Sequence, residues 1–363
     1  MKIRLLKITD RIIGVFAARV LKSPVKHAVS HPFTSVLLIR PGGLGDAVHL
    51  LFSIRLLKNR YPDAAIDILA ERRNASVFGL SPDIRKVLRY DVSSEFAAML
   101  WSPYDIVIDT EQWHRLSAVV ARVTKAGLRI GFDTNERRRM FNTSVPYAHD
   151  QYEVANFLRL LQPLGITPVP VTVPWLMVPP TISGNAELLL APFVKQQFVT
   201  IFPGASIPAR RWGADRFREV ALSLRSKGLG IVVVGGREDC ATGDRICADG
   251  VGLNLAGKTS LAETAAVIDR SALLISGDSG ILHIGVALGK PTVSLFGPGI
   301  AAKWAPRGER HIVLNRNLPC SPCTKFGTTP PCPDGVRCMA EITAQEVVAA
   351  VERLIFPAEA ATG

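Results

Sequence analysis

Hydrophobic and polar positions along the chain predict an alternation of strands and helices. Short runs rich in β-branched and aliphatic residues are followed by longer stretches whose apolar residues recur at helical spacing. This alternation is typical of βαβ units, so the predicted fold class is α/β with parallel sheets. The predicted strands span residues 35–39, 66–70, 104–108, 198–202, 230–234, 272–275 and 292–296. The predicted helices span residues 45–59, 115–125, 152–164, 214–226, 260–269, 280–288 and 343–355.

The pattern stops and restarts once, which predicts two domains. A proline-rich stretch at residues 168–180 interrupts it, and the 363 residues suit two α/β domains of roughly 150 residues each. Ligands of parallel sheets bind beyond the carboxyl ends of the strands, so the predicted site is a cleft between the two domains. The predicted parts are a basic amphipathic extension (1–34), a Rossmann-like domain (35–170), a linker (171–195), a second Rossmann-like domain (196–340) and a C-terminal helix with its tail (341–363).

Composition and charge narrow the choice of partner. Hydrophobic residues make up 48% of the chain and charged residues 20%, which is a globular composition. A formal net charge of +12 favours polyanions: nucleic acid, an anionic membrane face or phosphorylated small molecules. The sequence has no stripe of interleaved basic and aromatic residues, which argues against nucleic acid.

The N-terminal segment leaves two interpretations open. Its apolar stretch, residues 12–18, is too short for a membrane span and is flanked by charge at Asp10, Arg11 and Arg19, so we expect a cytoplasmic protein without a signal peptide. Apolar residues recur at helical spacing over residues 2–26 among seven basic ones. Such a helix either lies on an anionic membrane surface or packs as an extra helix on the body of the protein.

The first candidate loop, residues 39–46, leaves a buried strand and enters a helix. Gly42, Gly43 and Gly45 allow a tight turn and a close approach of ligand to the backbone. Their spacing is not that of the dinucleotide-binding G-x-G-x-x-G motif. Asp46, at the start of the helix, either caps that helix or acts as a general base.

The second candidate loop follows the strand that ends near residue 202. Small residues at 203–206 precede Arg210 and Arg211. A guanidinium offers a rigid fork of donors that suits a phosphate. The alternative is an ordinary strand-to-helix loop with solvated arginines.

The third loop, residues 275–283, carries the most specific pattern. Asp278, Ser279, Gly280 and His283 follow a strand and open a helix. Backbone N–H groups at a helix N-terminus bind anions such as a diphosphate. The alternative is a capped helix with a hydrogen-bonded histidine.

Two weaker signals lie between these loops. Glu238 follows a glycine turn and is a candidate acceptor of ribose hydroxyl groups. Lys258, Thr259 and Ser260 form a loop that enters the next helix, and this loop is a candidate for holding the nucleoside base.

Four cysteines cluster near the C-terminus with the spacing C-x2-C-x8-C-x5-C: Cys320, Cys323, Cys332 and Cys338. Four thiolates suit tetrahedral zinc, so a structural zinc site is one hypothesis. Free thiols or a redox-dependent disulfide are the alternatives.

Taken together, these segments resemble the ADP-heptose–lipopolysaccharide heptosyltransferases, glycosyltransferase family 9. The resemblance runs from about residue 35 to residue 355. It is carried by RPGGLGDAVHLLFSIRLLKNRYP, PGASIPARRWGADRF, LAGKTSLAETAAVI, SGDSGILHIGVALGKPTVSLFGP and the cysteine-rich CSPC…CPDGVRCM.

The resemblance implies a GT-B fold, in which two Rossmann-like domains face each other. The acceptor would bind the N-terminal domain, at the loop of Gly42, Gly43 and Gly45, and the ADP-sugar would bind the C-terminal one. Asp46 matches the family's proposed general base, and Arg210 stands where relatives usually carry a diphosphate-binding lysine.

Other donor-binding positions also match the family pattern, some in its phosphate loop and some at its nucleoside-binding positions. The phosphate-loop residues are Asp278, Ser279, Gly280 and His283, and the nucleoside-binding ones are Glu238, Lys258, Thr259 and Ser260.

The activity implied by the resemblance is inverting transfer of a heptose, or a related sugar, from an ADP-activated donor to a lipid A–core acceptor of lipopolysaccharide, without a catalytic metal. The enzyme would be peripheral on the cytoplasmic face of the inner membrane. Two alternatives stay open: an epimerase-like enzyme of similar architecture, and a non-catalytic nucleotide-sugar-binding protein.

Overall fold

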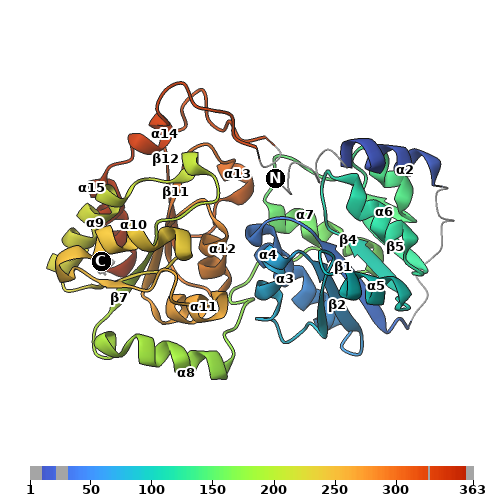
Figure 1. Cartoon of the computed structure of the whole chain (residues 1–363), viewed down its shortest axis with the longest axis horizontal. Helices are drawn as coiled ribbons and strands as arrows, with labels where there is room; N and C mark the ends of the chain where they lie inside the picture. The colour runs from blue at the N-terminus through green and yellow to red at the C-terminus, as the bar shows by residue number, and fades with distance from the viewer. Residues whose placement is uncertain (1–9, 22–31, 326–327, 357–363) are drawn as a thin grey trace, which may run out of the picture. The chain divides into compact units, whose positions relative to one another are not determined.

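The computed structural model describes residues 10–21, 32–325 and 328–356. The chain divides into two compact units, Met1–Thr172 and Val173–Gly363. Each unit is built around its own six-stranded sheet, with helices on both faces (Figure 1). All of the strand pairs in both sheets are parallel. The α/β class predicted from the alternating pattern is therefore confirmed.

The sheet of the first unit has the order β3-β2-β1-β4-β5-β6. Its central strand β1 is buried on both faces from Val36 to Arg40, because helices cover both sides. Leu38 of β1 pairs with Ile68 on one side and Ile108 on the other. The strands are β1 (Ser35–Arg40), β2 (Ala65–Ala70), β3 (Lys86–Arg89), β4 (Ile106–Asp109), β5 (Leu128–Phe132) and β6 (Thr143–Val145).

Helical segments join these strands, as parallel pairing requires, and other helices precede β1 and follow β6. The helices are η1 (Asp10–Gly14), α2 (Val15–Val20), α3 (Leu44–Arg60), α4 (Arg72–Phe78), α5 (Ser93–Trp101), α6 (Arg115–Val123), η2 (Asn135–Met140), α7 (Glu153–Arg159) and η3 (Gln162–Leu164).

The sheet of the second unit has the order β12-β11-β10-β7-β8-β9. The strands are β7 (Phe198–Phe202), β8 (Gly230–Val233), β9 (Leu253–Asn254), β10 (Leu273–Gly277), β11 (Thr292–Phe296) and β12 (His311–Asn315). Its helices are α8 (Pro180–Leu189), η4 (Ala191–Phe193), η5 (Pro208–Arg210), α9 (Ala214–Ser226), η6 (Arg237–Asp239), α10 (Cys240–Cys247), η7 (Ala248–Gly250), α11 (Leu261–Arg270), α12 (Gly280–Ala287), α13 (Ala301–Trp304), α14 (Arg337–Ala340) and α15 (Ala344–Ile355).

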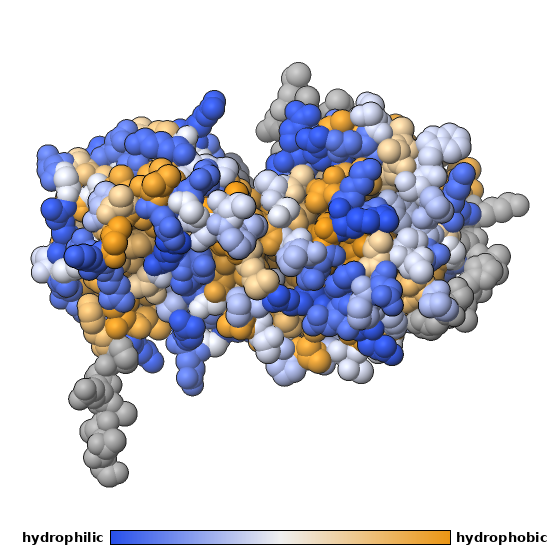
Figure 2. Space-filling view, turned by 90° about the horizontal axis from the view of Figure 1, so that it is seen from below, coloured by the Kyte–Doolittle hydropathy of each residue, from blue (hydrophilic) through white to orange (hydrophobic). Residues whose placement is uncertain are grey.

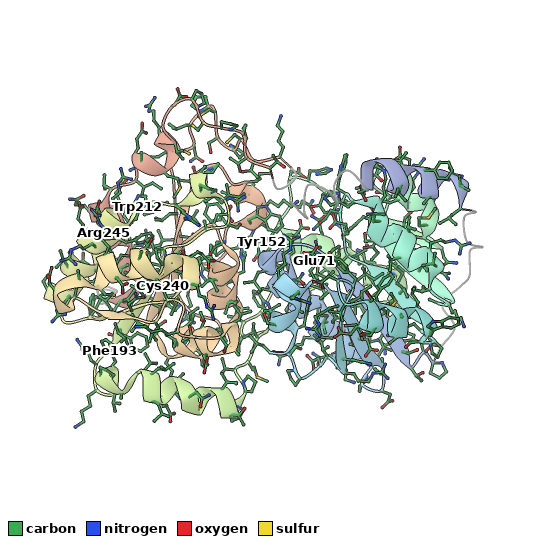
Figure 3. All side chains as sticks on the ribbon, viewed as in Figure 1. Glu71, Tyr152, Phe193, Trp212, Cys240 and Arg245 are labelled. Atoms are coloured by element: carbon green, nitrogen blue, oxygen red, sulfur yellow. The ribbon has the colours of Figure 1, made fainter. Side chains whose placement is uncertain are left out.

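The C-terminal helix α15 is part of the core of the second unit. Val347 and Val351 are buried in the same cluster as Phe217 of α9. Trp212, labelled in Figure 3, donates a hydrogen bond from its indole Nε1 to the carbonyl oxygen of Ile342 (3.0 Å). Helix α15 thus covers part of one face of this sheet.

The stretch expected as a linker, residues 171–195, contains more structure than a connection. It includes helix α8, which packs against α11. Arg270 of α11 donates a hydrogen bond to Ser183 of α8 (2.9 Å). Most of this proline-rich stretch therefore belongs to the second unit, whose boundary falls at Val173.

The predicted elements are found in the structure, and most of the elements that were not predicted are short. All seven predicted strands and all seven predicted helices are present, with ends shifted by a few residues. The elements not predicted include the short β3, β6, β9, α4 and α10, and also two longer helices, α5 with nine residues and α8 with ten. The short elements have too few residues to display a helical or a strand period.

No helix among the described residues is long and apolar enough to cross a membrane. On the face drawn in Figure 2, hydrophilic and hydrophobic side chains are interspersed. The predicted N-terminal helix is described from Asp10 to Val20, and the rest of its expected range, 2–9 and 21–26, is either not helical (Leu21) or outside the described residues.

Candidate functional site

The turn between β1 and α3 places Asp46 at the carboxyl edge of the first sheet. Gly42 has φ +106°, a left-handed conformation that L side chains rarely adopt, and a Cβ there would lie 3.1 Å from Nη2 of Arg40. Gly43 is the N-cap residue of α3, and no side chain caps this helix. Asp46 lies in the first turn of α3 without being its cap, so the capping interpretation of this residue is wrong.

Asp46 instead faces a buried arginine. Arg40, the last residue of β1, has a side chain only 1% exposed. Its Nη2 lies 3.4 Å from Oδ2 of Asp46 and 3.3 Å from Oε2 of Glu111. Its Nη1 donates to the carbonyl oxygen of Thr110 (2.8 Å). The guanidinium is thus held by two carboxylates and the backbone, and the partly exposed Asp46 (19%) is the carboxylate nearer to solvent.

Glu111 comes from the neighbouring strand. It follows β4, which pairs with β1, so the carboxyl ends of the two strands bring it beside Arg40. Its Oε1 accepts the backbone N–H groups of Trp113 (3.0 Å) and His114 (3.3 Å) before α6. The sequence analysis missed Arg40 and Glu111. A signal was present, because polar residues directly after a buried strand lie at the ligand-binding edge of a parallel sheet.

A second hydrogen-bond network around a carboxylate, that of Glu153, lies close to Arg40 and Asp46. Glu153, fully buried at the start of α7, accepts hydrogen bonds from Tyr147 (2.8 Å) and Gln112. The charges of Glu153 and Asp46 both act on the Tyr147 hydroxyl, which shows that the two networks are neighbours. Burial and these carboxylates raise the pKa of Tyr147, so the phenol stays protonated.

Arg40 and Glu111 stabilise each other's charged form. Burial alone would raise the pKa of Glu111, but the combined effect of Arg40, His114, Arg137 and the backbone N–H of Trp113 outweighs it, and the pKa lies below the ordinary value of 4.5. Burial likewise opposes the charge of Arg40, while Asp46 and Glu111 raise its pKa overall. Arg40 and Glu111 are therefore both charged at neutral pH.

In the second unit, the predicted phosphate loops come together. Nη1 of Arg210 lies 2.9 Å from Oδ2 of Asp278, and their side chains are 15% and 5% exposed. Arg210 ends the short helix η5 in the connection after β7, and Asp278 follows the adjacent strand β10. The interpretation of Arg210 as a solvated surface arginine is therefore wrong.

A glycine in the loop after a third strand lies directly against the carboxylate of Asp278. A Cβ at Gly299, in the loop after β11, would lie 2.0 Å from Oδ2 of Asp278, so any larger residue would displace the carboxylate. Burial raises the pKa of Asp278, although Arg210 acts to lower it. This glycine carried no signal in the sequence, because its contact spans two loops.

Helix α12 begins where the sequence predicts. Ser279 is its N-cap residue and accepts a hydrogen bond from the N–H of Leu282 (3.2 Å), while Gly280 opens the helix. His283 is buried, and burial together with the charge of Arg210 lowers its pKa to about 3. The imidazole is therefore neutral at physiological pH and can donate or accept one hydrogen bond without adding charge.

The predicted nucleoside-binding loops are adjacent. The N–H of Gly257 donates to the carbonyl oxygen of Gly235 (2.9 Å), which joins the loop of Glu238 to the loop of residues 257–260. Glu238 is exposed. Lys258 donates to the carbonyl oxygen of Asn254 (2.9 Å).

Two of these loop residues also hold the local structure together. The hydroxyl groups of Thr259 and Thr264 lie 2.9 Å apart. Ser260 forms a capping box with Glu263 at the start of α11. In Figure 3, Cys240 marks the start of α10, directly after the loop that carries Glu238. All of the predicted donor residues thus lie at the carboxyl ends of adjacent strands of one sheet.

The four clustered cysteines share one region of the surface. Burial raises the pKa of the Cys338 thiol, and the three other cysteines raise it further. Cys320, Cys332 and Cys338 line one surface cavity, and Cys320 and Cys323 line another. Among the described residues, however, no three His, Cys, Asp or Glu side chains are placed as ligands of one ion. Zinc at this cluster stays a prediction.

Residues 96–332, more than half of the chain, match the family described as glycosyltransferase family 9 (heptosyltransferase). The chain is 28% identical over 336 residues to lipopolysaccharide heptosyltransferase 3 of Escherichia coli (strain K12), covering 86% of this chain and 95% of that protein. It is 24% identical over 311 residues to lipooligosaccharide heptosyltransferase 2 of Haemophilus influenzae, covering 77% and 88% of the two chains.

Solved structures agree on the fold. The E. coli ADP-heptose lps heptosyltransferase II superposes with a TM-score of 0.73 at 22% identity, covering 89% of this chain and 98% of that one. The glycosyl transferase family 9 protein from Veillonella parvula DSM 2008 superposes with a TM-score of 0.75 at 19% identity, covering 92% and 99%. The predicted fold class, α/β of the GT-B type with two parallel sheets, is thereby confirmed.

The Arg40–Glu111 pair predicts a pH-dependent stability. Because the folded pKa of Glu111 lies below 4.5, the pair stabilises the fold above about pH 4.5. This stabilisation is lost as the pH falls through the lowered value. Glu111→Gln should reduce the free energy of unfolding at pH 7 by about 3 kcal/mol, because it removes one partner of a buried ion pair.

Urea unfolding of both proteins between pH 7 and pH 3 measures this effect. The difference between the wild type and Glu111→Gln should shrink at the acid end. The exposed Asp150→Asn serves as the control in the same unit. An equal stability of wild type and Glu111→Gln at pH 7 would contradict the assignment.

Proposed function

The chain belongs to glycosyltransferase family 9, and from this premise we propose that it transfers a heptose from an ADP-activated donor to a lipopolysaccharide core acceptor, with inversion at the anomeric carbon. The observation that carries the proposal is the chemistry at the two sheet edges. One edge presents a carboxylate held beside a buried arginine (Asp46 and Arg40), and the other presents an arginine next to a helix N-terminus (Arg210 and α12).

In this proposal Asp46 is the general base. It takes the proton from an acceptor sugar hydroxyl while that oxygen forms a bond to the anomeric carbon and the bond to the ADP oxygen breaks. Arg40 supports this role by its position, since its Nη2 lies 3.4 Å from Oδ2 of Asp46 and holds that carboxylate at the edge of the sheet.

The donor side would stabilise the departing ADP. Negative charge grows on the diphosphate as the bond breaks. Arg210 supplies a positive charge, the N–H groups at the start of α12 supply donors, and neutral His283 supplies a further hydrogen bond. The adjacent loops of Glu238 and Lys258 would hold the nucleoside.

The proposed acceptor indicates where in the cell the enzyme would act. Several relatives are named as lipopolysaccharide or lipooligosaccharide heptosyltransferases. A lipid A–core acceptor is anchored in a bilayer, so we place the enzyme at the cytoplasmic face of the inner membrane, where a net charge of +12 suits anionic lipid.

A donor and acceptor screen tests the function. ADP-heptose and other nucleotide-sugars are offered with lipid A–core acceptors of defined length, and the linkage formed is analysed. Heptose transfer from ADP-heptose is expected. Consumption of the donor without an acceptor would instead support the epimerase-like alternative, and ADP binding without turnover would support a non-catalytic protein.

Asp46→Asn should lower kcat at least about 100-fold, because a positioned general base contributes about two to four powers of ten to the rate. Its affinity for ADP should stay within about twofold, since this carboxylate does not contact the nucleotide in the proposed site. The exposed Asp63→Asn is the matched control and should keep wild-type kcat. Transfer by Asp46→Asn at the wild-type rate would remove Asp46 as the base.

Arg210→Ala should weaken ADP and ADP-sugar binding about 10- to 100-fold, because a charge-assisted hydrogen bond to the diphosphate is lost. Arg210→Lys should recover part of the affinity, since it restores the charge without the planar fork. The exposed Arg225→Ala, on α9 of the same unit, is the control. Calorimetric titration with ADP measures all three, and unchanged affinity in Arg210→Ala would contradict the role.

Zinc at the cysteine cluster is the remaining proposal. Metal analysis of the purified protein should find about one zinc per chain, as four thiolates in one site would bind. Cys323→Ser should lose this zinc, whereas Cys247→Ser, in the helix α10, should keep it. A protein without metal, or one that holds iron instead, would contradict the zinc assignment.

A further inference from the structure

The N-terminal helix presents an apolar stripe to solvent. Ile13, Phe16 and Val20 are 56%, 68% and 61% exposed. Their spacing of three and four residues places them along one side of the η1–α2 segment. Three exposed large hydrophobic side chains in eight residues form a patch rather than an isolated exposure.

The opposite side of this segment is fixed to the first unit. Asp10 is 4% exposed, and its Oδ1 accepts the backbone N–H groups of Arg115 (2.6 Å) and Leu116 (2.8 Å) at the start of α6. A carboxylate at a helix N-terminus is a stabilising contact. A Cβ at Gly14 would lie 3.1 Å from Cβ of Arg115, so the segment packs closely on α6.

Exposed basic residues lie on the helix that packs against α2. Helix η2 packs against both α2 and α6. Figure 1 draws α2 alongside α6 at the edge of the first unit. On η2, Arg138 and Arg139 are exposed. Glu136 of the same helix is ion-paired with Arg115 (2.7 Å), which ties η2 to the anchor of the N-terminal segment.

The sequence around the stripe is almost free of negative charge. Residues 1–34 contain seven basic residues and one acidic residue, Asp10. That single carboxylate is buried in the contact with α6. An anionic surface that approached the stripe would therefore meet no exposed acidic side chain from residues 1–34.

We propose that Ile13, Phe16 and Val20, together with Arg138 and Arg139 on the adjoining helix η2, form a docking surface for an anionic lipid bilayer. The apolar side chains would enter the boundary between headgroups and acyl chains, and the guanidinium groups would pair with lipid phosphates. The inference deepens the proposed function, since it identifies the part of the chain that would meet the membrane in which the acceptor is anchored.

The docking surface is connected to the candidate catalytic site. Asp10 binds the first N–H groups of α6, and Glu111 binds the N–H groups of the two residues just before them. Glu111 in turn holds Arg40, the partner of Asp46. The same short loop thus supports the anchored N-terminal segment and the carboxylate cluster.

Vesicle co-sedimentation tests the surface. Wild-type protein should bind vesicles of phosphatidylcholine with phosphatidylglycerol and bind vesicles of pure phosphatidylcholine at least about tenfold less. The triple variant Ile13→Ser, Phe16→Ser and Val20→Ser should lose at least about tenfold in binding to the anionic vesicles, because three apolar side chains no longer leave water. The matched control is Leu188→Ser with Val194→Ser, which are 80% and 77% exposed in the second unit and should bind as wild type.

The charged part of the surface has its own variant. Arg138→Gln with Arg139→Gln should weaken anionic binding several-fold, since each basic residue near such a surface adds to its electrostatic attraction. This variant changes only exposed side chains, so it keeps the test decisive if the triple variant fails to fold. Wild-type binding by both variants, or no binding of wild type to either vesicle, overturns the proposal. Loss of binding in the control variant as well would show a non-specific apolar effect and would also overturn it.

Transfer assays separate this inference from the proposed function. With a deacylated, water-soluble core acceptor the triple variant should turn over at the wild-type rate, and with acceptor embedded in vesicles it should be at least about fivefold slower. Equal rates on both acceptors would contradict the docking surface while leaving the transferase intact. Absence of transfer by any protein would instead reject the proposed function, with the vesicle-binding result standing by itself.

Discussion

The buried guanidinium of Arg40 holds together the edge of the first sheet on which its chemistry depends. It ends β1 and bonds at once to Asp46 on the helix that follows, to Glu111 from the next strand and to the backbone at Thr110. A charge so deeply buried is costly unless every donor finds a partner. The loops after β1 and β4 are therefore constrained to one arrangement. Asp46 is placed by this network rather than by the helix cap.

In the second unit, a different arginine links the ends of neighbouring strands. Arg210 and Asp278 lie in the loops after the adjacent strands β7 and β10 and form an ion pair in a nearly buried position. In the loop after β11, Gly299 lies so close to Asp278 that a Cβ there would displace the carboxylate. In both units an arginine–carboxylate pair links neighbouring strand ends, and in both the rest of the candidate site lies in the loops around it. A parallel sheet allows such links, because the carboxyl ends of all of its strands lie at the same edge.

The sequence was informative wherever a signal is local. The period of the apolar residues located the long strands and helices, and the glycine-bearing loops at 39–46 and 275–283 were expected at the strand ends where they are found. The capping of α12 by Ser279 also follows from neighbouring residues alone. Short elements such as β9, with two residues, fell below the length at which a period can be recognised.

Residue types, spacing and the family resemblance thus determined the α/β class, the candidate loops and the family of transferase. Only the tertiary structure decided which side chains meet: Arg40 and Glu111 are 71 positions apart and Asp10 and Leu116 are 106 apart, yet each pair is in hydrogen-bond contact. It also decided that Asp46 is not a cap, that Arg210 is not solvated and that the N-terminal helix is anchored by its one acidic residue. The physical reason is that a periodic pattern shows only which face of an element is buried. A contact between distant residues depends on which strands and helices are neighbours in space, and packing across the whole sheet decides that.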